Sequence, residues 1–540
     1  MLPLAAASLV FVLLVGAQLW RPLMYDDANF YLAGKAVAET GLPFGNQGWM
    51  SDRDDYSQRE QWALWHPPLY VYLLGVLARL GGASPAVMRL PGILAGVATG
   101  ALTAALAHQL TRGSPEQRSL AASLAGALVL LCPLTVQSAL ILDIDFPVLV
   151  PLTLLFVLLY LRLEASRLWP VLIPLFGLLL WAKMTNPVPL LAIVVVWQTL
   201  RGKYRRALRD LVAIGLGGGA LFLATWVAAT KLLGFPFDMP FEVNLVQWQA
   251  SADVARQAYT SPGAFIAGLA NSVLWLGPGL VGLGLLGVAW RCATLVCEWR
   301  IRTVDVLIGL LIVLVLGYVN KSAGWFPKYQ VGIAPLLAVL GAPVVARAWR
   351  GSLGPLLVVF GCAAFVVDRA LVSDSWALQR TWAIDPTPAA WLLALFAIAL
   401  AWRRYAAPAG LAAIALGWSL STDLTQATAQ YSTGYWYGTT GTVEAARWVD
   451  ANLPPGNTYV ASKEVAIRAR DNQRYVDQES LMYLFTTGTA FYKSWAGQPI
   501  PAVIAWQREP YVADLVRTSL HLAGYQETAR FGDYVIYEPA

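Results

Sequence analysis

Long apolar stretches separated by short polar connections fill most of the first 425 residues of the chain. A helix needs about 20 mostly apolar residues to cross a bilayer, and most of these stretches approach that length. The pattern predicts a polytopic α-helical membrane protein with about 13 spans, an odd number that puts the termini on opposite sides. The spans are expected near residues 3–20, 86–108, 119–140, 146–163, 169–185, 187–200, 210–231, 263–290, 303–320, 329–348, 353–370, 388–402 and 408–421.

One apolar segment, residues 67–80 (PPLYVYLLGVLARL), is too short to cross a bilayer. Counting it as a span would reverse the side of every later connection and place the basic cluster at 201–209 outside. We therefore predict an interfacial or re-entrant helix on the outer face. It belongs to a long first outer loop, residues 21–84, whose aromatic and acidic content favours a functional role.

The composition changes after about residue 425, where short alternating segments replace the long apolar runs. Helical periodicity at 442–452 and 511–522 and strand-like runs at 458–462, 502–506 and 534–537 predict a small α/β domain. The expected domains are therefore a transmembrane domain at 1–424 and an extracytoplasmic α/β domain at 425–540.

The basic residues choose the orientation, because they occur in alternate connections that hold few acids. All of them fall on one side if the N-terminus is cytoplasmic, which puts the C-terminal domain outside and the chain in the inner (plasma) membrane. These residues are Arg112 and Arg118; Arg162 and Arg167; Arg201, Lys203, Arg205, Arg206 and Arg209; Arg291, Arg300 and Arg302; Arg347 and Arg350; and Arg403 and Arg404.

Composition supports the same class. Only 13% of the residues are charged, against about 25% in an ordinary soluble domain, which argues against a soluble enzyme. The net charge is +6, and its basic residues are concentrated in the connections expected on the cytoplasmic side. The charge therefore does not indicate nucleic acid as a partner. The four cysteines lie in predicted spans or on the cytoplasmic side, so we infer neither a disulfide framework nor a cysteine metal site.

Two adjacent acids, Asp26 and Asp27, follow the first predicted span. Carboxylates at a membrane boundary usually face a polar cavity, and one here is suited to take a proton from an acceptor hydroxyl. The alternative is an acidic stop where the chain leaves the membrane.

Further polar residues at the outer ends of spans carry both signs of charge. They are His66, Arg89, Asp143, Asp145, Lys183, and Lys328 with Tyr329 beside it. Cations and carboxylates at one depth suggest an anionic lipid headgroup held beside a general base. A structural ion-pair network, helix caps and snorkelling lysines are the alternatives.

The order of these motifs resembles the GT-C glycosyltransferases over about the first 345 residues. The closest branch is similar to the protein O-mannosyltransferases and lipid A aminoarabinose transferases, a glycosyltransferase family 39-like group. The motifs are Asp-Asp after the first span, His-Pro-Pro-Leu, Arg-Leu-Pro, Asp-x-Pro, an outer lysine and Lys-Tyr. Such enzymes are inverting transferases that use polyprenyl-phosphate sugars outside the cytoplasm, with interfacial helices in the first loop.

Carried over by position, the resemblance implies catalytic roles for Asp26, Asp27 and Asp145, with Asp26 matching the first-loop catalytic acid. It implies substrate-binding roles for a second set: His66, Arg89, Asp143, Lys183, Lys328 and Tyr329. The chain has Trp65-His66 where the aminoarabinose branch has an acid and a lysine, which leaves a divalent metal ion open. The metal ligands, if any, are unknown.

The expected function is therefore transfer of a sugar from a polyprenyl-phosphate donor to a protein, lipid or glycan acceptor outside the cytoplasm. The main alternative is a transporter or flippase for an anionic lipid or solute, which often shows internal repeats and charges at the membrane midplane. The sequence has no such repeat, and its charges gather at the outer surface. A scaffold presenting the C-terminal domain is a third reading that leaves the charges unexplained.

Overall fold

The computed structural model describes residues 2–21, 23, 25–44, 62–64, 66–164, 166–242, 245, 262–318, 328–348, 440–454, 457–469, 474–478, 501–507 and 513–540. The chain divides into two compact units. Unit 1 comprises residues 1–20, 89–228 and 243–431, and unit 2 comprises residues 21–88, 229–242 and 432–540.

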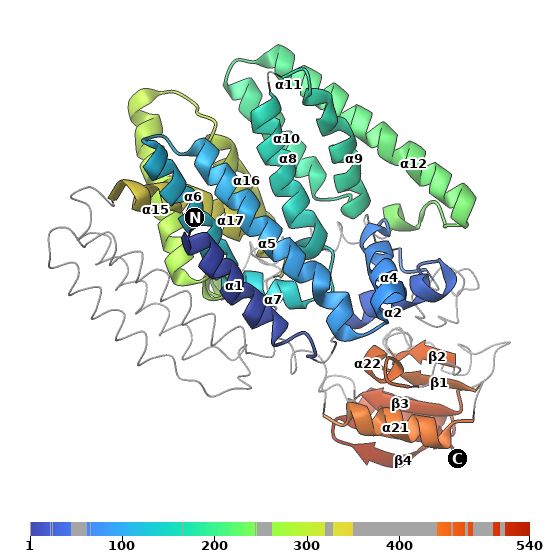
Figure 1. The fold of residues 1–540 in the computed structure, drawn as a ribbon. Helices are drawn as coiled ribbons and strands as arrows, with labels where there is room; N and C mark the ends of the chain where they lie inside the picture. The colour runs from blue at the N-terminus through green and yellow to red at the C-terminus, as the bar shows by residue number, and fades with distance from the viewer. Residues whose placement is uncertain are drawn as a thin grey trace, which may run out of the picture. The chain divides into compact units, whose positions relative to one another are not determined.

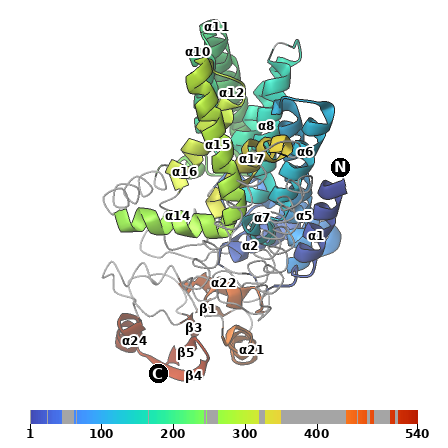
Figure 2. The same cartoon turned by 90° about the vertical axis from the view of Figure 1, so that its left-hand side faces the viewer.

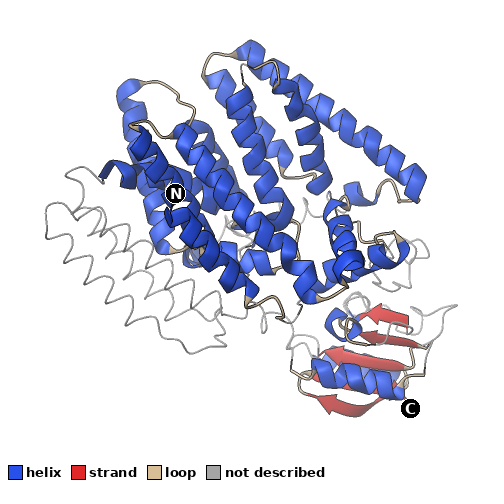
Figure 3. Ribbon diagram, in the orientation of Figure 1, coloured by secondary structure: helices blue, strands red, loops and turns tan. Residues whose placement is uncertain are grey.

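Unit 1 is a bundle of helices (Figure 1, Figure 3). The α-helices that lie wholly or mainly in this unit are α1 (Leu2–Gly16), α5 (Pro85–Leu110), α6 (Pro115–Leu130), α7 (Pro133–Leu140), α8 (Val150–Leu163), α9 (Leu172–Ala182), α10 (Pro187–Leu200), α11 (Tyr204–Asp210), α12 (Gly217–Leu233), α14 (Pro262–Leu276), α15 (Pro278–Glu298), α16 (Asp305–Tyr318) and α17 (Ile333–Ala348). The tighter or wider turns are the π-helices η1 (Asp145–Leu149) and η3 (Leu211–Leu216) and the 3-10 helices η2 (Trp169–Val171) and η5 (Lys328–Gln330).

Four continuous helical stretches of the described residues are long and apolar enough to cross a membrane: Pro85–Leu110, Asp145–Leu163, Tyr204–Leu233 and Pro278–Glu298. The pair formed by α6 and α7 passes the same test together, and six apolar helices of 10–17 residues are shorter. The chain is thus a multi-span helical membrane protein, as its sequence predicts. The predicted spans at 353–370, 388–402 and 408–421 lie outside the described residues, so the number of 13 stays a prediction.

Two predicted spans are broken. The stretch 119–140 bends by 53° between α6 and α7, where Pro133 cannot continue the helical hydrogen bonds. The stretch 263–290 consists of two helices, α14 and α15, because Gly277 has a positive φ of 83° and Pro278 starts the second helix. Figure 2 shows α14 lying across the bundle beside α7, whereas α15 stands upright. Of the two helices, α15 is long and apolar enough to cross a membrane.

Backbone-to-backbone packing joins α15 and α17. A Cβ atom added to Gly287 would lie 2.1 Å from the carbonyl oxygen of Leu340, and one on Gly341 would lie 2.8 Å from that of Leu283. Small residues at such contacts let membrane helices approach closely, where packing holds them together. Helices α15 and α17 are therefore closely packed against each other in unit 1.

Unit 2 begins with α2 (Tyr25–Thr40), which packs against α4 (Leu69–Gly81). A Cβ on Gly75 would lie 2.2 Å from Cγ1 of Val37, so the helices touch only because glycine stands there. The predicted apolar segment at 67–80 is thus a helix of 13 residues. Its location at a membrane surface stays a prediction.

The C-terminal residues form a five-stranded sheet in the order β2-β1-β3-β5-β4. Its strands are β1 (Thr458–Ala461), β2 (Arg474–Asp477), β3 (Val503–Gln507), β4 (Tyr525–Phe531) and β5 (Tyr534–Pro539). Strand β1 runs parallel to β2 and β3, whereas β5 pairs antiparallel with β3 and β4. The predicted small α/β fold is confirmed, and strands β2 and β4 are additions to the predicted set.

Helices cover both faces of this sheet, α21 (Thr442–Asn452) on one and α24 (Ala513–Leu522) on the other (Figure 2). Val516 and Leu520 of α24 pack with Trp506, and Ala445 and Val449 of α21 pack in a second core on the opposite face. The short helix α22 (Lys463–Ala466) follows β1. Burial on both faces explains why β1 and β3 read as continuous apolar runs.

Candidate active site

A sharp corner between α7 and α8 presents the two aspartates of the Asp-x-Asp-x-Pro segment. Helix α7 ends at Leu140 and the backbone turns extended at Ile141. Oδ1 of Asp143 then accepts a hydrogen bond from the backbone N–H of Ile144 at 2.6 Å, which holds the turn. Pro147 lacks an N–H, and the chain re-enters the helix through the wide π-turn η1. Such single π-turns are frequent at functional sites.

Asp145 forms a buried ion pair with Lys183. The lysine Nζ lies 2.7 Å from Oδ1 of Asp145, and both residues are almost completely buried, at 6% and 5% exposure. Lys183 is the first residue past α9 and has an extended backbone, with φ −160° and ψ 113°. The end of α9 thus brings the ammonium group to Asp145, the first residue of η1.

Asp143 forms the matching pair with Lys328, from η5. Tyr329 lies between the two lysines, since its ring centroid is 4.9 Å from Nζ of Lys183 and 5.1 Å from Nζ of Lys328. Cations within about 6 Å of a ring are attracted to its electron-rich face. Five of the predicted site residues, from three separate parts of the chain, are therefore brought into one cluster of balanced charge.

This charged cluster borders a narrow cavity of about 80 Å³ between α8, α10, α16 and α17. The cavity lining on η1 and α8 extends from Asp145 to Val157, about 18 Å at the helical rise per residue. Its polar lining residues are Asp145, Thr153, Asn186 and Tyr329, and the others are mainly aliphatic. The cavity is therefore charged at the Asp145 end and apolar further along.

Oδ2 of Asp145 is buried and accepts no hydrogen bond from any residue that the structure describes. A buried carboxylate oxygen without a donor is costly, so such an atom is suited to receive one from a bound molecule.

Arg89 lies in the same unit and is buried, at 2% exposure. Its Nε donates to the carbonyl oxygen of Leu140 at 2.7 Å, and its Nη1 donates to that of Leu19 at 2.8 Å. The guanidinium thus secures the end of α7, just before the aspartate corner.

The other predicted residues belong to unit 2. Asp26 and Asp27 lie in the first turn of α2, where Asp27 is buried at 2% exposure. His66 is half-buried just before α4. The Asp26 side chain lies outside the described part of the chain.

The sequence-based reading did not include Asn186 or the polar residues of α7. Thr135, Gln137 and Ser138 are buried, and the hydroxyl oxygens of Thr135 and Ser138 have no hydrogen-bond partner among the described residues. Three polar residues in an eight-residue helix within an apolar stretch are the signal that could have found them.

Within the described ranges, no group of three or more His, Cys, Asp or Glu side chains is arranged to hold a metal ion. The carboxylates of Asp143 and Asp145 each face a lysine. This cluster therefore does not offer the oxygen-rich, acidic environment that Mg²⁺ or Ca²⁺ takes.

Comparison with known proteins gives a family signature and a fold. The family model described as dolichyl-phosphate-mannose-protein mannosyltransferase matches residues 65–229. A comparison with curated protein sequences gives no match. The chain is similar in structure to ArnT from Cupriavidus metallidurans bound to undecaprenyl phosphate, with a TM-score of 0.56 and 16% identity over 99% of this chain and 97% of that one.

The apo structure of the same ArnT is similar at a TM-score of 0.54 and 15% identity, over 99% of this chain and 97% of that one. Likeness at this identity shows a shared fold. The chain therefore has an ArnT-like GT-C fold with a small C-terminal sheet, and in fold and family signature it resembles the GT-C glycosyltransferases of the protein O-mannosyltransferase and aminoarabinose transferase group.

Proposed function

We propose that the chain is an inverting glycosyltransferase that moves a sugar from a polyprenyl-phosphate donor to an acceptor on the extracytoplasmic side of the membrane. The acceptor is a protein, lipid or glycan. The observation that carries this proposal is the cluster of two lysines, two aspartates and Tyr329 at the end of an apolar cavity. A charged end joined to an apolar channel suits a ligand with a phosphate and a long hydrocarbon chain.

The donor lies with its first isoprene units in the cavity along α8 and its phosphate at Lys183 and Lys328. Both ammonium groups now face aspartates, and a phosphate beside them offers acceptors for the same donors. ArnT, which shares the fold, was solved with undecaprenyl phosphate, a lipid of this chemical class. His66 and Arg89 are further phosphate contacts in this proposal, and Arg89 also holds the aspartate corner.

Transfer is a single displacement. The acceptor oxygen attacks the anomeric carbon of the sugar from the face opposite the phosphate, and the bond from that carbon to the phosphate oxygen breaks. Polyprenyl phosphate leaves with the bonding electrons, and the cations of Lys183 and Lys328 stabilise the negative charge that grows on it. The configuration at the anomeric carbon is inverted.

The proton of the acceptor hydroxyl goes to the carboxylate of Asp26, which is the proposed general base. Asp145 orients the reacting groups, since its free Oδ2 is available to accept a hydrogen bond from a hydroxyl of the sugar or the acceptor. Asp143 holds Lys328, and Asp27 is a neighbour of the base within the same proposal.

The proposed orientation places the N-terminus in the cytoplasm and the residues from 425 to 540 outside, because all the basic connections then share the cytoplasmic side. The Asp145 end of the bundle accordingly faces the outer leaflet, from which a polyprenyl donor enters sideways.

The test is incubation of the purified full-length protein with labelled polyprenyl-phosphate sugars of several kinds. Wild-type protein should release polyprenyl phosphate and transfer or hydrolyse the sugar. Asp26→Asn should lower the rate about 10²–10⁴-fold at normal expression, which is the usual contribution of a general base. Asp514→Asn is the matched control, since that side chain is 93% exposed on α24 and should leave the rate unchanged.

Near-wild-type activity of Asp26→Asn would refute its role as the base. Movement of intact lipid between leaflets without release of polyprenyl phosphate would support the flippase instead.

A further inference from the structure

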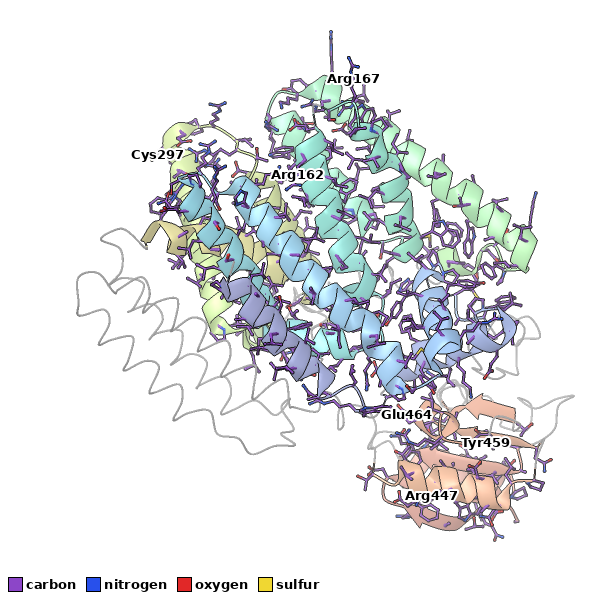
Figure 4. All side chains as sticks on the ribbon, viewed as in Figure 1. Arg162, Arg167, Cys297, Arg447, Tyr459 and Glu464 are labelled. Carbon is purple, nitrogen blue, oxygen red and sulfur yellow. The ribbon has the colours of Figure 1, made fainter. Side chains whose placement is uncertain are left out.

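A second and larger cavity, about 290 Å³, lies in unit 1 at the opposite helix ends from Asp145. Asp145 precedes α8, whereas this cavity is lined by Leu161 and Glu164 at the other end of that helix. The same holds for α17, which begins near Lys328 and contributes Pro343 and Arg347. Figure 4 shows Arg162, Arg167 and Cys297 towards this end of the bundle. The proposed donor site therefore does not account for the cavity.

Most of the charges at this cavity are already balanced. Arg291 donates from Nε and Nη2 to the two carboxylate oxygens of Asp305, at 2.6 and 2.7 Å. Arg302 pairs with Glu298. Glu164 is the one acid in the lining, and three cations surround it: Arg201, Lys203 and Arg206. These groups leave no net negative charge facing the cavity.

Two arginines of the lining have no acidic partner among the described residues. Arg112 has no hydrogen bond or ion pair in the part of the chain that the structure describes. Arg347 has no acidic partner there either, and its guanidinium carbon lies 5.5 Å from the ring centroid of Trp290. Both side chains are exposed. Within the described residues, these two arginines give the cavity a net positive charge that is available to an anion.

A buried hydroxyl points to a ligand independently of these charges. Thr111 is 5% exposed and lines the cavity, and its Oγ1 has no hydrogen-bond partner among the described residues. A buried hydroxyl left without a partner is unfavourable, and a phosphate oxygen would satisfy it.

The rest of the lining is apolar. Leu110, Leu161, Leu340 and Val344 line the cavity. Trp290, in the second half of α15, is a further lining residue and is 45% exposed. Its indole adds a large ring with an apolar body to the lining. The lining thus suits a ligand that is both anionic and hydrophobic.

We propose that this cavity binds the phosphate headgroup of an anionic phospholipid from the leaflet at this end of the bundle. The phosphate contacts Arg112, Arg347 and the Thr111 hydroxyl, and the glycerol and upper acyl chains lie against the apolar lining. Basic pockets between membrane helices bind anionic headgroups in this way. The volume is at the lower end of ligand pockets, about 300–1,000 Å³, which suits a headgroup rather than a whole lipid.

The experiment titrates purified full-length protein in neutral detergent with phosphatidylglycerol, phosphatidylcholine or inorganic phosphate, and counts bound molecules by native mass spectrometry. We expect saturable binding of phosphatidylglycerol, much weaker binding of phosphatidylcholine, and none of inorganic phosphate at equal concentration. The double variant Arg112→Gln/Arg347→Gln should bind phosphatidylglycerol about 30-fold more weakly, from the loss of two cation contacts.

Two controls separate this site from a general attraction of charge. Arg167→Gln removes an exposed arginine from the same end of the bundle but outside the cavity, and should leave binding unchanged. Arg112→Lys/Arg347→Lys keeps both charges and should retain most of the affinity. Release of polyprenyl phosphate by the double glutamine variant, if the enzymatic proposal holds, reports separately on the donor site and on folding.

Wild-type affinity in the double glutamine variant would overturn the proposal. Equal binding of phosphatidylcholine would overturn the role of the charge, and tight binding of inorganic phosphate would assign the cavity to a soluble anion.

Discussion

The two ends of the bundle in unit 1 both hold charges of both signs, but they balance them differently. At the Asp145 end, two lysines meet two aspartates one to one, and all four are largely buried. At the cavity end, Glu164 is surrounded by three cations, while Arg112 and Arg347 have no acid partner within the described residues. At the Asp145 end, a lysine must exchange its aspartate for the anion in order to bind it. At the cavity end, the two arginines can bind an anion without breaking an ion pair among the described residues. This difference favours a transient substrate at one end and a resident lipid at the other.

The sharpest test of this comparison is sidedness, because the expected effect is all or none. Cys297 is exposed near the end of α15, on the cavity side. Trp20, 73% exposed, follows α1 at the other end. In intact cells, a membrane-impermeant maleimide should label Trp20→Cys, built with the native cysteines replaced by serine, and should not label Cys297. Labelling of Cys297 before permeabilisation would reverse the proposed orientation.

The largest energetic effect is expected at the Asp145–Lys183 pair. Lys183→Met leaves a buried carboxylate without its partner, which typically destabilises by about 3–5 kcal/mol. Replacing both residues, Lys183→Met with Asp145→Asn, removes the uncompensated charge, so the double variant should be clearly more stable than the single one. Both should lose sugar transfer. The measurement is the thermal unfolding temperature, in detergent, of the wild type, Lys183→Met and the double variant.

The control for these variants is Arg167→Gln, which replaces an exposed side chain. It should change the free energy of unfolding by no more than about 0.5 kcal/mol. Equal unfolding temperatures for Lys183→Met and wild type would mean that the pair does not form.

A smaller effect is expected at Glu164, just past the end of α8. Burial alone would raise the pKa of this carboxyl, but hydrogen bonds from Lys203 and Gln198 and the charges of Lys203 and Arg201 outweigh it and lower the pKa below 4.5. The ionised carboxylate therefore stabilises the folded state at pH values above its ordinary pKa of 4.5, and this stabilisation is lost as the pH falls through the lowered pKa. Glu164→Gln should destabilise by about 1–3 kcal/mol at neutral pH.

Wild type and Glu164→Gln should accordingly converge in unfolding temperature when the pH is lowered well below 4.5. A constant difference between them from neutral to acid pH would show that the charge of Glu164 does not stabilise the fold.

Much of the fold followed from local patterns. Apolar runs of bilayer length mark α5, α8, α12 and α15, and short apolar runs rich in β-branched and aromatic residues mark β3 and β5. Strand β4 was not predicted from the sequence. It lies at the edge of the sheet and most of its side chains are exposed, so its residues show no apolar alternation. The break of 263–290 into two helices was not predicted either. A hydropathy average over a long window does not register the single residue Gly277, whose positive φ separates the two helices.

The candidate site shows the same division. Asp143, Asp145, Lys183, Lys328 and Tyr329 were recognisable singly, because charges beside apolar runs are rare and expensive in a membrane. Their pairing was not predictable, since Lys183 reaches Asp145 across 38 positions and Lys328 reaches Asp143 across a longer separation. The role of Arg89 as a clamp on two carbonyl groups was equally hidden, because its backbone partners leave no trace in their own residue types.

Residue patterns along the chain were enough to predict a membrane protein of many helices, the positions of its charges, and a small α/β fold after the helices. Hydropathy and charge act over neighbouring residues, so they can be read along the chain. The pairing of each lysine with its aspartate became visible only in the folded chain, as did the two arginines that have no acidic partner among the described residues. Those outcomes depend on distances between residues far apart in sequence, which are set when the helices pack.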